Sequence, residues 1–225
     1  MQNYYFKDAL FEYDNKKYYF DDILDSLVSI GIKKNDTIIV HSDIMKFGKY
    51  LNFNEPRLIT DVYIDAFLNV IGTNGTLIMP TYSYSFCNGE IFDPIKTPSH
   101  VGALTNAIIQ KERSFRSIHP IFSVCAIGKN AKQITEGLSK NSFGIGSIFD
   151  RLQKIDSSKY VMFGVPYFAC THIHYIERIV GVNYRYVKKF KGKIRLNNKI
   201  YEDSYEFYVR YLNKNINPTF DKIEN

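Results

Sequence analysis

The sequence contains no tryptophan and only three cysteines among its 225 residues. Glycine and proline are sparse, at 13 and 7 residues, which excludes a collagen-like chain. No run of about 18 apolar residues is present, so we expect no membrane span, and the first residues lack the pattern of a signal peptide. The cysteines Cys87, Cys125 and Cys170 match no zinc spacing and fit reduced thiols, so we expect a cytoplasmic protein.

The composition predicts one folded domain over residues 1–225. Hydrophobic residues make up 45% and charged residues 23% of the chain, which is enough apolar material for a core. The net charge of +6 is uneven, because residues 1–100 are acidic overall and residues 101–225 are basic. The stretch 178–199 contains eight Lys or Arg and no acid, so it is either a phosphate-attracting surface or a solvated basic face. No nucleic-acid-binding motif accompanies this charge, so we expect no nucleic-acid partner.

Apolar strands alternate with helical patterns along the chain. Short β-branched runs predict buried strands at 36–42, 75–80, 121–128 and 159–165. Periodic apolar residues predict helices at 18–32, 55–72, 101–112, 130–138, 147–155, 171–181 and 205–215, and 184–203 is typical of a hairpin. This order predicts an α/β fold, with a mixed central sheet covered by helices on both faces.

The residues that could carry chemistry are few. Neither a phosphate-binding glycine loop nor a G-x-S-x-G elbow occurs, and the five histidines lack metal-ligand spacing, so we expect no metal. His174 and Glu177 are three residues apart in an expected helix, so they share one face. A carboxylate that holds an imidazole makes it a general base, and a surface ion pair is the equally weighted alternative.

Six segments together resemble the aminoglycoside 3-N-acetyltransferase family. RSIHPIFSVCAIGKNA (116–131) and VMFGVPYFACTHIHYIE (161–177) are the most specific, because they contain RS-x-HP and T-x-x-H-x-x-E in the family's order. The others are VHSDIMKFG (40–48), GTLIMPTYSYSF (75–86), FDPIKTPSHVGALTNAI (92–108) and FGIGSIFDRL (143–152). The resemblance implies an α/β acetyltransferase that moves acetyl from acetyl-CoA to an amine, with a family-like core at about 36–200.

The resemblance also implies roles for individual residues. His174 would be the base, with Glu177 as its partner and Thr171 beside them. The turn at His41 and Ser42, with a helix start after it, would bind CoA, whose pyrophosphate suits a helix N-terminus. Thr81 and Tyr82 would line the pantetheine channel, and Arg116, Ser117, His119 and Ser123 would shape the cofactor side. Transfer would be direct, with the cysteines as bystanders.

The acceptor is less defined than the reaction. Phe168 stands where aminoglycoside-modifying members carry an acid, and a basic chain is a poor host for a polycation. We therefore expect a nucleotide-linked amino sugar whose phosphates contact Tyr184 and Arg185. An aminoglycoside is the alternative acceptor, and an inactive CoA-binding or regulatory protein is the alternative of another class. The sequence does not distinguish a monomer from a homo-oligomer.

Overall fold

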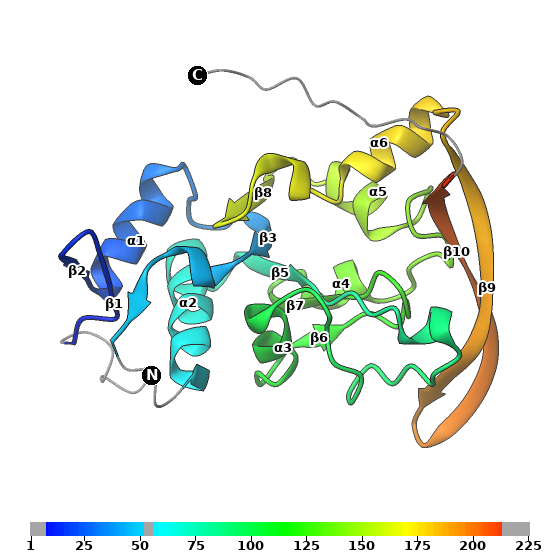
Figure 1. The fold of residues 1–225 in the computed structure, drawn as a ribbon, viewed down its shortest axis with the longest axis horizontal. Coiled ribbons are helices and arrows are strands. Elements are labelled where there is room, and N and C mark those ends of the chain that lie inside the picture. Colours follow the sequence, from blue (N-terminus) through cyan, green and yellow to red (C-terminus); the bar gives the residue numbers. More distant parts are fainter. Residues whose placement is uncertain (1–7, 52–55, 213–225) are drawn as a thin grey trace.

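The centre of the computed structural model, which describes residues 8–51 and 56–212, is a five-stranded sheet (Figure 1). Its order is β6-β7-β5-β3-β8, and the strands comprise Phe115–Arg116, Val124–Gly128, Thr76–Pro80, Thr37–Ser42 and Ser158–Phe163 in that order. β3 is parallel to β5 and β8, whereas β7 is antiparallel to both β5 and β6. The predicted mixed sheet is confirmed, although its antiparallel strands are β6 and β7 and not the C-terminal hairpin.

Both faces of this sheet are buried. In β3, Ile38 and Val40 belong to one hydrophobic cluster, whereas Ile39 belongs to a second cluster on the opposite face. Leu77 and Ile78 of β5 separate in the same way. Successive side chains of a strand point to opposite faces, so a strand buried on both sides is apolar at every position. This explains why the central strands are short continuous apolar runs in the sequence.

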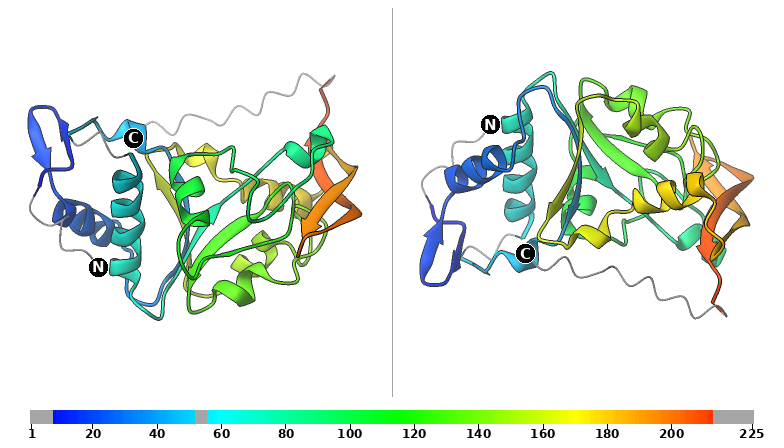
Figure 2. Two further views of the ribbon diagram at one scale, coloured as in Figure 1. Left: turned by 90° about the horizontal axis from the view of Figure 1, so that it is seen from below. Right: turned by 90° about the horizontal axis from the view of Figure 1, so that it is seen from above.

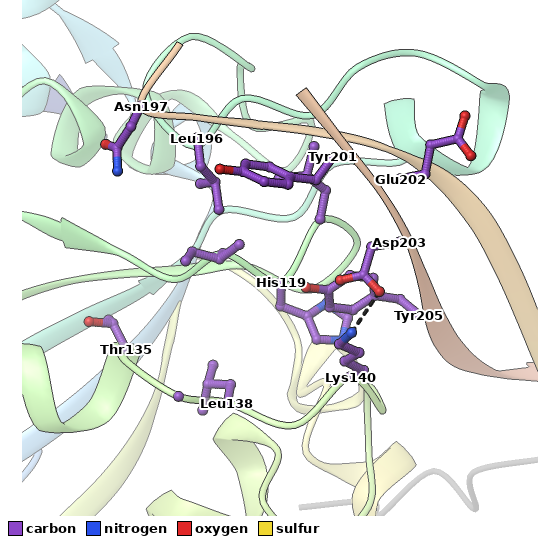
Figure 3. A pocket seen from close by; sticks show the side chains of 13 residues that line it. His119, Thr135, Leu138, Lys140, Leu196, Asn197, Tyr201, Glu202, Asp203 and Tyr205 are labelled. Atoms are coloured by element: carbon purple, nitrogen blue, oxygen red, sulfur yellow. Dashed lines mark hydrogen bonds and ion pairs between the residues drawn. The ribbon is translucent and has the colours of Figure 1, made fainter. Parts of the chain in front are cut away.

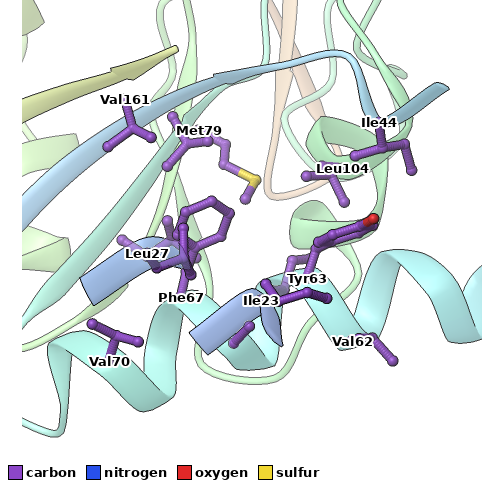
Figure 4. Packing of buried hydrophobic residues seen from close by; sticks show 14 of the residues in the cluster. Ile23, Leu27, Ile44, Val62, Tyr63, Phe67, Val70, Met79, Leu104 and Val161 are labelled. Carbon is purple, nitrogen blue, oxygen red and sulfur yellow. The ribbon is translucent and has the colours of Figure 1, made fainter. Parts of the chain in front are cut away.

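The helices α1 (Phe20–Ser29), α2 (Pro56–Ile71) and α3 (Ala103–Ile109) cover the first face. Figure 2 shows α1 and α2 together on this side of the sheet. In α2, Tyr63, Phe67 and Val70 recur at intervals of three or four residues and pack with Met79 of β5 (Figure 4). Phe67 has no exposed surface and contacts the ring of Phe163 in β8 at 5.1 Å.

The opposite face is covered by three short helices and a long hairpin. The helices are α4 (Ala131–Thr135), α5 (Ile148–Gln153) and α6 (Ile173–Val180), and the hairpin strands are β9 (Arg185–Leu196) and β10 (Lys199–Arg210). Phe149 of α5 and Tyr175 of α6 join the same cluster as Ile194 and Tyr205 of the hairpin. The hairpin curves around one end of the molecule, next to α6 (Figures 1 and 2).

The helix predicted at 205–215 is wrong over its described part. Residues 205–210 lie in β10, which pairs with β9 from Lys199↔Leu196 to Arg210↔Arg185, and residues 213–215 lie outside the described residues. Asn197 and Asn198 form the two-residue turn, both with positive φ, at 48° and 62°. Two such residues suit the turn that joins right-twisted strands, and aromatic residues favour the pleated surface. The cross-strand partner therefore overrides the local helical pattern.

Short elements complete the fold, and the sequence pattern did not predict them. β1 (Phe11–Tyr13), β2 (Lys16–Tyr18) and β4 (Lys49–Tyr50) form a small antiparallel sheet. The 3-10 helices η1 (Ile44–Lys46), η2 (Ser85–Asn88) and η3 (Tyr167–Ala169) follow the ends of β3, β5 and β8. Among residues 8–51 and 56–212, no helix is long and apolar enough to cross a bilayer, and no three side chains form a group that could hold a metal.

Truncating Phe67 to alanine should lower the free energy of unfolding by about 3–5 kcal/mol, because the change leaves a cavity between α2 and the sheet. Asn69→Ala, on the exposed side of the same helix, is the control and should change it by less than about 0.5 kcal/mol. Urea unfolding of both variants measures the difference. Equal effects would contradict the packing described for α2.

Candidate functional site

The predicted histidine–carboxylate pair lies on α6. His174 Nδ1 is 2.7 Å from Glu177 Oε2, three residues further along the helix. A carboxylate oxygen only accepts hydrogen bonds, so Nδ1 donates its proton and Nε2 keeps a lone pair. His174 therefore has the tautomer that a general base requires.

His174 lines a cavity of about 330 Å³ at the edge of the sheet where the parallel strands end. Ligands of open α/β sheets bind outside these carboxyl ends. His41 and Ser42 reach the cavity from the end of β3, and Tyr82 reaches it from the segment after β5. Thr171, just before α6, completes this part of the wall. The structure thus brings together five of the residues that the sequence analysis assigned to catalysis or to CoA.

His41 and Thr171 contact each other across 130 residues of sequence. His41 Nε2 lies 3.2 Å from Thr171 Oγ1, and the Thr171 backbone N–H donates to the same nitrogen at 3.4 Å. Burial lowers the pKa of His41 to about 4, so its ring is neutral near pH 7. The helix expected after Ser42 is only the three-residue η1, so a helix dipole contributes little here. Neither a charged His41 nor a helix dipole therefore supports the predicted contact with the CoA pyrophosphate, which stays a prediction.

Glu177 is held by more than His174. The Tyr184 hydroxyl donates to Glu177 Oε1 at 2.9 Å, and Arg185 Nε forms an ion pair with Oε2 at 2.7 Å. We expected Tyr184 and Arg185 to contact acceptor phosphates, but their polar groups are directed at this carboxylate. Burial and the Arg185 charge lower the pKa of His174 and outweigh Glu177, which raises it.

Four residues expected on the cofactor side support the strand ends; Thr81, Ser117 and Ser123 are buried, and Arg116 is half-buried. Arg116 donates to the Thr81 carbonyl at 2.8 Å, and the Ser123 hydroxyl donates to the same carbonyl at 2.6 Å. The Ser117 hydroxyl accepts from the Val124 backbone N–H at 3.0 Å. Burial lowers the pKa of Arg116 to about 10, which leaves it charged at neutral pH. None of these four side chains lines the cavity around His174, so contact with CoA stays a prediction for them.

His119 lies on a second cavity, of about 560 Å³, between the segment around Leu138 and the β9–β10 hairpin (Figure 3). Its Nδ1 accepts from the Phe122 backbone N–H at 3.1 Å, and burial lowers its pKa to about 3. An ion pair of 2.6 Å between Lys140 and Asp203 lines the same cavity (Figure 3). The structure therefore separates His119 from the cavity of His174.

Phe168 lies on the surface, in η3. Its side chain is 58% exposed and is not part of the cavity wall, although the next residue, Ala169, lines it. An acid at position 168 would therefore stand beside the cavity entrance and not in its wall. The role of Phe168 in acceptor choice stays a prediction.

The aromatic part of the wall was missed by the sequence analysis. Tyr84, Phe122 and Phe207 line the cavity, together with Val101 and Val165. These residues come from five separate segments. All except Phe207 fall inside the segments that resemble the family, but the resemblance implied no role for them, and only the fold shows that they share one wall.

The basic stretch 178–199 forms the end of α6 and most of β9. Lys189 and Lys193 lie opposite Glu206 and Glu202 in the register of the hairpin. Opposite charges on facing strands compensate each other. Arg185 is the only cation of this stretch that lines the cavity of His174, and it is already paired. The charge argument for a phosphate-bearing acceptor is weakened accordingly.

The model of a protein family described as aminoglycoside 3-N-acetyltransferase matches residues 39–224. The chain belongs to this family. Aminoglycoside N(3)-acetyltransferase IV from Salmonella sp. is 27% identical over 169 residues, which cover 72% of this chain and 60% of the relative. Aminoglycoside N(3)-acetyltransferase III from Salmonella sp. is 23% identical over 185 residues, which cover 73% and 62%. The chain thus spans about three fifths of the length of these curated relatives.

Several solved structures share the fold. Aminoglycoside acetyltransferase AAC(3)-Xa superposes with a TM-score of 0.73 and 22% identity, over 83% of this chain and 70% of that one. AAC-IIIb, solved as a binary complex with CoASH, gives 0.73 and 20%, over 84% and 75%. The YokD protein from Bacillus subtilis gives 0.71 and 20%, over 84% and 81%. The predicted fold class and family are confirmed.

His119→Asn should make the free energy of unfolding less dependent on pH. In the unfolded chain a histidine is protonated below about pH 6.5, whereas the buried ring of the folded protein has a pKa of about 3. The free energy of unfolding is therefore lost as pH falls from 6.5, at up to about 1.4 kcal/mol per pH unit for one such group. Asparagine can still accept the Phe122 N–H but does not titrate. Denaturant unfolding at pH 7 and pH 5 measures the slope, with exposed His100→Asn as the control. A slope as steep as that of the parent would contradict the buried neutral state of His119.

Proposed function

We propose that the protein transfers the acetyl group of acetyl-CoA to an amine of an aminoglycoside or a related amino sugar. The observation that carries the proposal is the His174–Glu177 pair, which lies beside a cavity at the carboxyl ends of the parallel strands. The printed names of the relatives describe N(3)-acetylation of aminoglycosides, and one solved neighbour was crystallised with CoASH. Membership of the same family supports the same kind of reaction.

The chemistry needs an amine nitrogen with a free lone pair. In the proposed step this nitrogen attacks the thioester carbonyl carbon while His174 Nε2 takes the amine proton. The carbon–sulfur bond then breaks, and the CoA thiolate leaves and receives a proton from the imidazolium. Because the pKa of His174 lies below its ordinary value, the ring is neutral at pH 7 and ready to accept a proton.

The cavity suits the uncharged arm of CoA. Its wall is largely apolar and aromatic, with Val101, Phe122 and Val165 as members, and this matches a pantetheine chain and an acetyl group. His41, Ser42 and Tyr82 lie on the same wall and are the residues from the predicted cofactor set that could contact CoA directly. Thr81 and Ser123 would act indirectly, through the strand ends that they support.

Two acceptor classes remain to be compared. No aspartate or glutamate belongs to the described wall of this cavity, and a fully protonated aminoglycoside would find no direct carboxylate partner there. This observation keeps a nucleotide-linked amino sugar as the second candidate acceptor. Release of CoA thiol should be measured with acetyl-CoA and a panel of aminoglycosides, free amino sugars and nucleotide-linked amino sugars. Turnover of aminoglycosides alone would exclude the nucleotide-linked acceptor, whereas turnover of the nucleotide-linked sugars alone would exclude the aminoglycoside.

His174→Ala should reduce turnover by roughly 10²–10⁴-fold, because the proton of the attacking amine loses its acceptor. Binding of acetyl-CoA, measured by calorimetry, should change little. Exposed His100→Ala is the matched control and should keep the parent rate. Near-full turnover of His174→Ala at saturating acceptor would refute the base assignment. Saturable acetyl-CoA binding by the parent protein without thiol release for any acceptor would instead favour a binding-only or regulatory protein.

A further inference from the structure

We propose that Tyr184 and Arg185 are positioning residues that hold Glu177 in place against His174, so that the β9–β10 hairpin is part of the catalytic apparatus. The proposal deepens the acetyl-transfer function and rests on it for its kinetic consequences. It replaces the expectation, based on sequence, that these two residues bind the acceptor.

Three side chains converge on one carboxylate. Glu177 Oε1 accepts a hydrogen bond from the Tyr184 hydroxyl at 2.9 Å. Glu177 Oε2 lies 2.7 Å from His174 Nδ1 and 2.7 Å from Arg185 Nε. The side chains of Glu177 and Arg185 are only 12% and 13% exposed, so water screens this group weakly. Both carboxylate oxygens are therefore engaged, and the plane of the carboxylate is set by residues from outside α6.

The hairpin holds these residues rigidly. Arg185 is the first residue of β9, and its Nη1 donates to the backbone carbonyl of Tyr208 in β10 at 3.1 Å. The Tyr208 hydroxyl donates to the carbonyl of Val182 at 3.2 Å, and the Tyr211 N–H donates to the carbonyl of Tyr184 at 3.0 Å. Residues 182–185 are thus tied at two points to β10 and at a third to Tyr211, directly after it. Figure 1 shows the end of α6 beside the hairpin.

Arg185 also balances the charge of Glu177. A lone carboxylate beside His174 would favour the imidazolium, which cannot act as a base. Burial and the Arg185 charge lower the pKa of His174, whereas the hydrogen bond and charge of Glu177 raise it. Tyr184 and Arg185 contact the carboxylate of Glu177, and His41, Tyr82 and Tyr84 share the cavity wall with His174. The ring of Tyr208 has a cation–π contact with each of Arg185 and Arg178. Of these, Arg185 is the cation that shares the carboxylate oxygen with His174.

The test compares Arg185→Gln with Arg185→Lys, and uses Lys188→Gln, on an exposed position of the same strand, as the control. Imidazole NMR signals give the pKa of His174 directly and need no substrate. Arg185→Gln should raise this pKa by about one unit, because the compensating charge is lost. Arg185→Lys keeps a charge and should stay within about half a unit of the parent. Tyr184→Phe removes one hydrogen bond and should shift the pKa less than Arg185→Gln.

The kinetic readout follows from the sign of that shift. A general base acts only when it is unprotonated, so a raised pKa of His174 moves the acid limb of the kcat/KM profile to higher pH. The rate of Arg185→Gln should therefore return to most of the parent rate at pH 9. An unchanged His174 pKa in Arg185→Gln, or an equal rise in Arg185→Lys, would overturn the proposal. So would a normal pH profile with a raised KM for the acceptor, since that result places Arg185 on the substrate. Absence of transfer by the parent protein would refute the proposed function, and the NMR comparison would still decide whether Arg185 acts on His174.

Discussion

The burial of β3 and β5 on both faces is the constraint on which the rest of this molecule depends. Ile38 and Ile39 point into different hydrophobic clusters, so each face needs its own cover. Three helices supply the cover on one side, and α4, α5, α6 and the hairpin supply it on the other. Loops and short 3-10 turns are left to occupy the carboxyl edge, where the cavity lies. The position of the site is therefore a consequence of how the sheet is buried.

The polar chemistry of the site follows from the same burial. His41 and His174 are both shielded from water, which disfavours their charged forms. A neutral imidazole accepts protons, whereas an imidazolium would only donate them. Glu177 could reverse this preference at His174, and the nearby Arg185 offsets its charge. The site thus keeps two neutral histidines beside one compensated ion pair.

The positive charge of this protein lies mainly outside the cavity of His174. A net charge of +6 favours anions over the molecule as a whole. Its densest part is β9, where two of the four lysines face glutamates across the hairpin, and the cavity itself contains no unpaired cation among its described lining residues. The cavity is therefore close to neutral, and shape and apolar contact contribute more to its recognition of ligands than charge does.

The α/β class, the central strands and the His174–Glu177 pair could be predicted from the sequence, because each rests on local periodicity or on spacing within one helix. The full length of the second hairpin strand could not: residues 184–203 are typical of a hairpin, but residues 205–210 also fit a helix until Asn197 and Asn198 turn the chain back onto β9. The contacts of Tyr184 and Arg185 with Glu177 could not be predicted either, because they depend on that hairpin. Nor could the contact between Phe122 and Phe207, whose rings lie 4.9 Å apart although 85 residues separate them in the sequence. Contacts within one element are encoded by neighbouring residues, whereas contacts between elements arise only when the whole chain excludes water from both faces of its sheet.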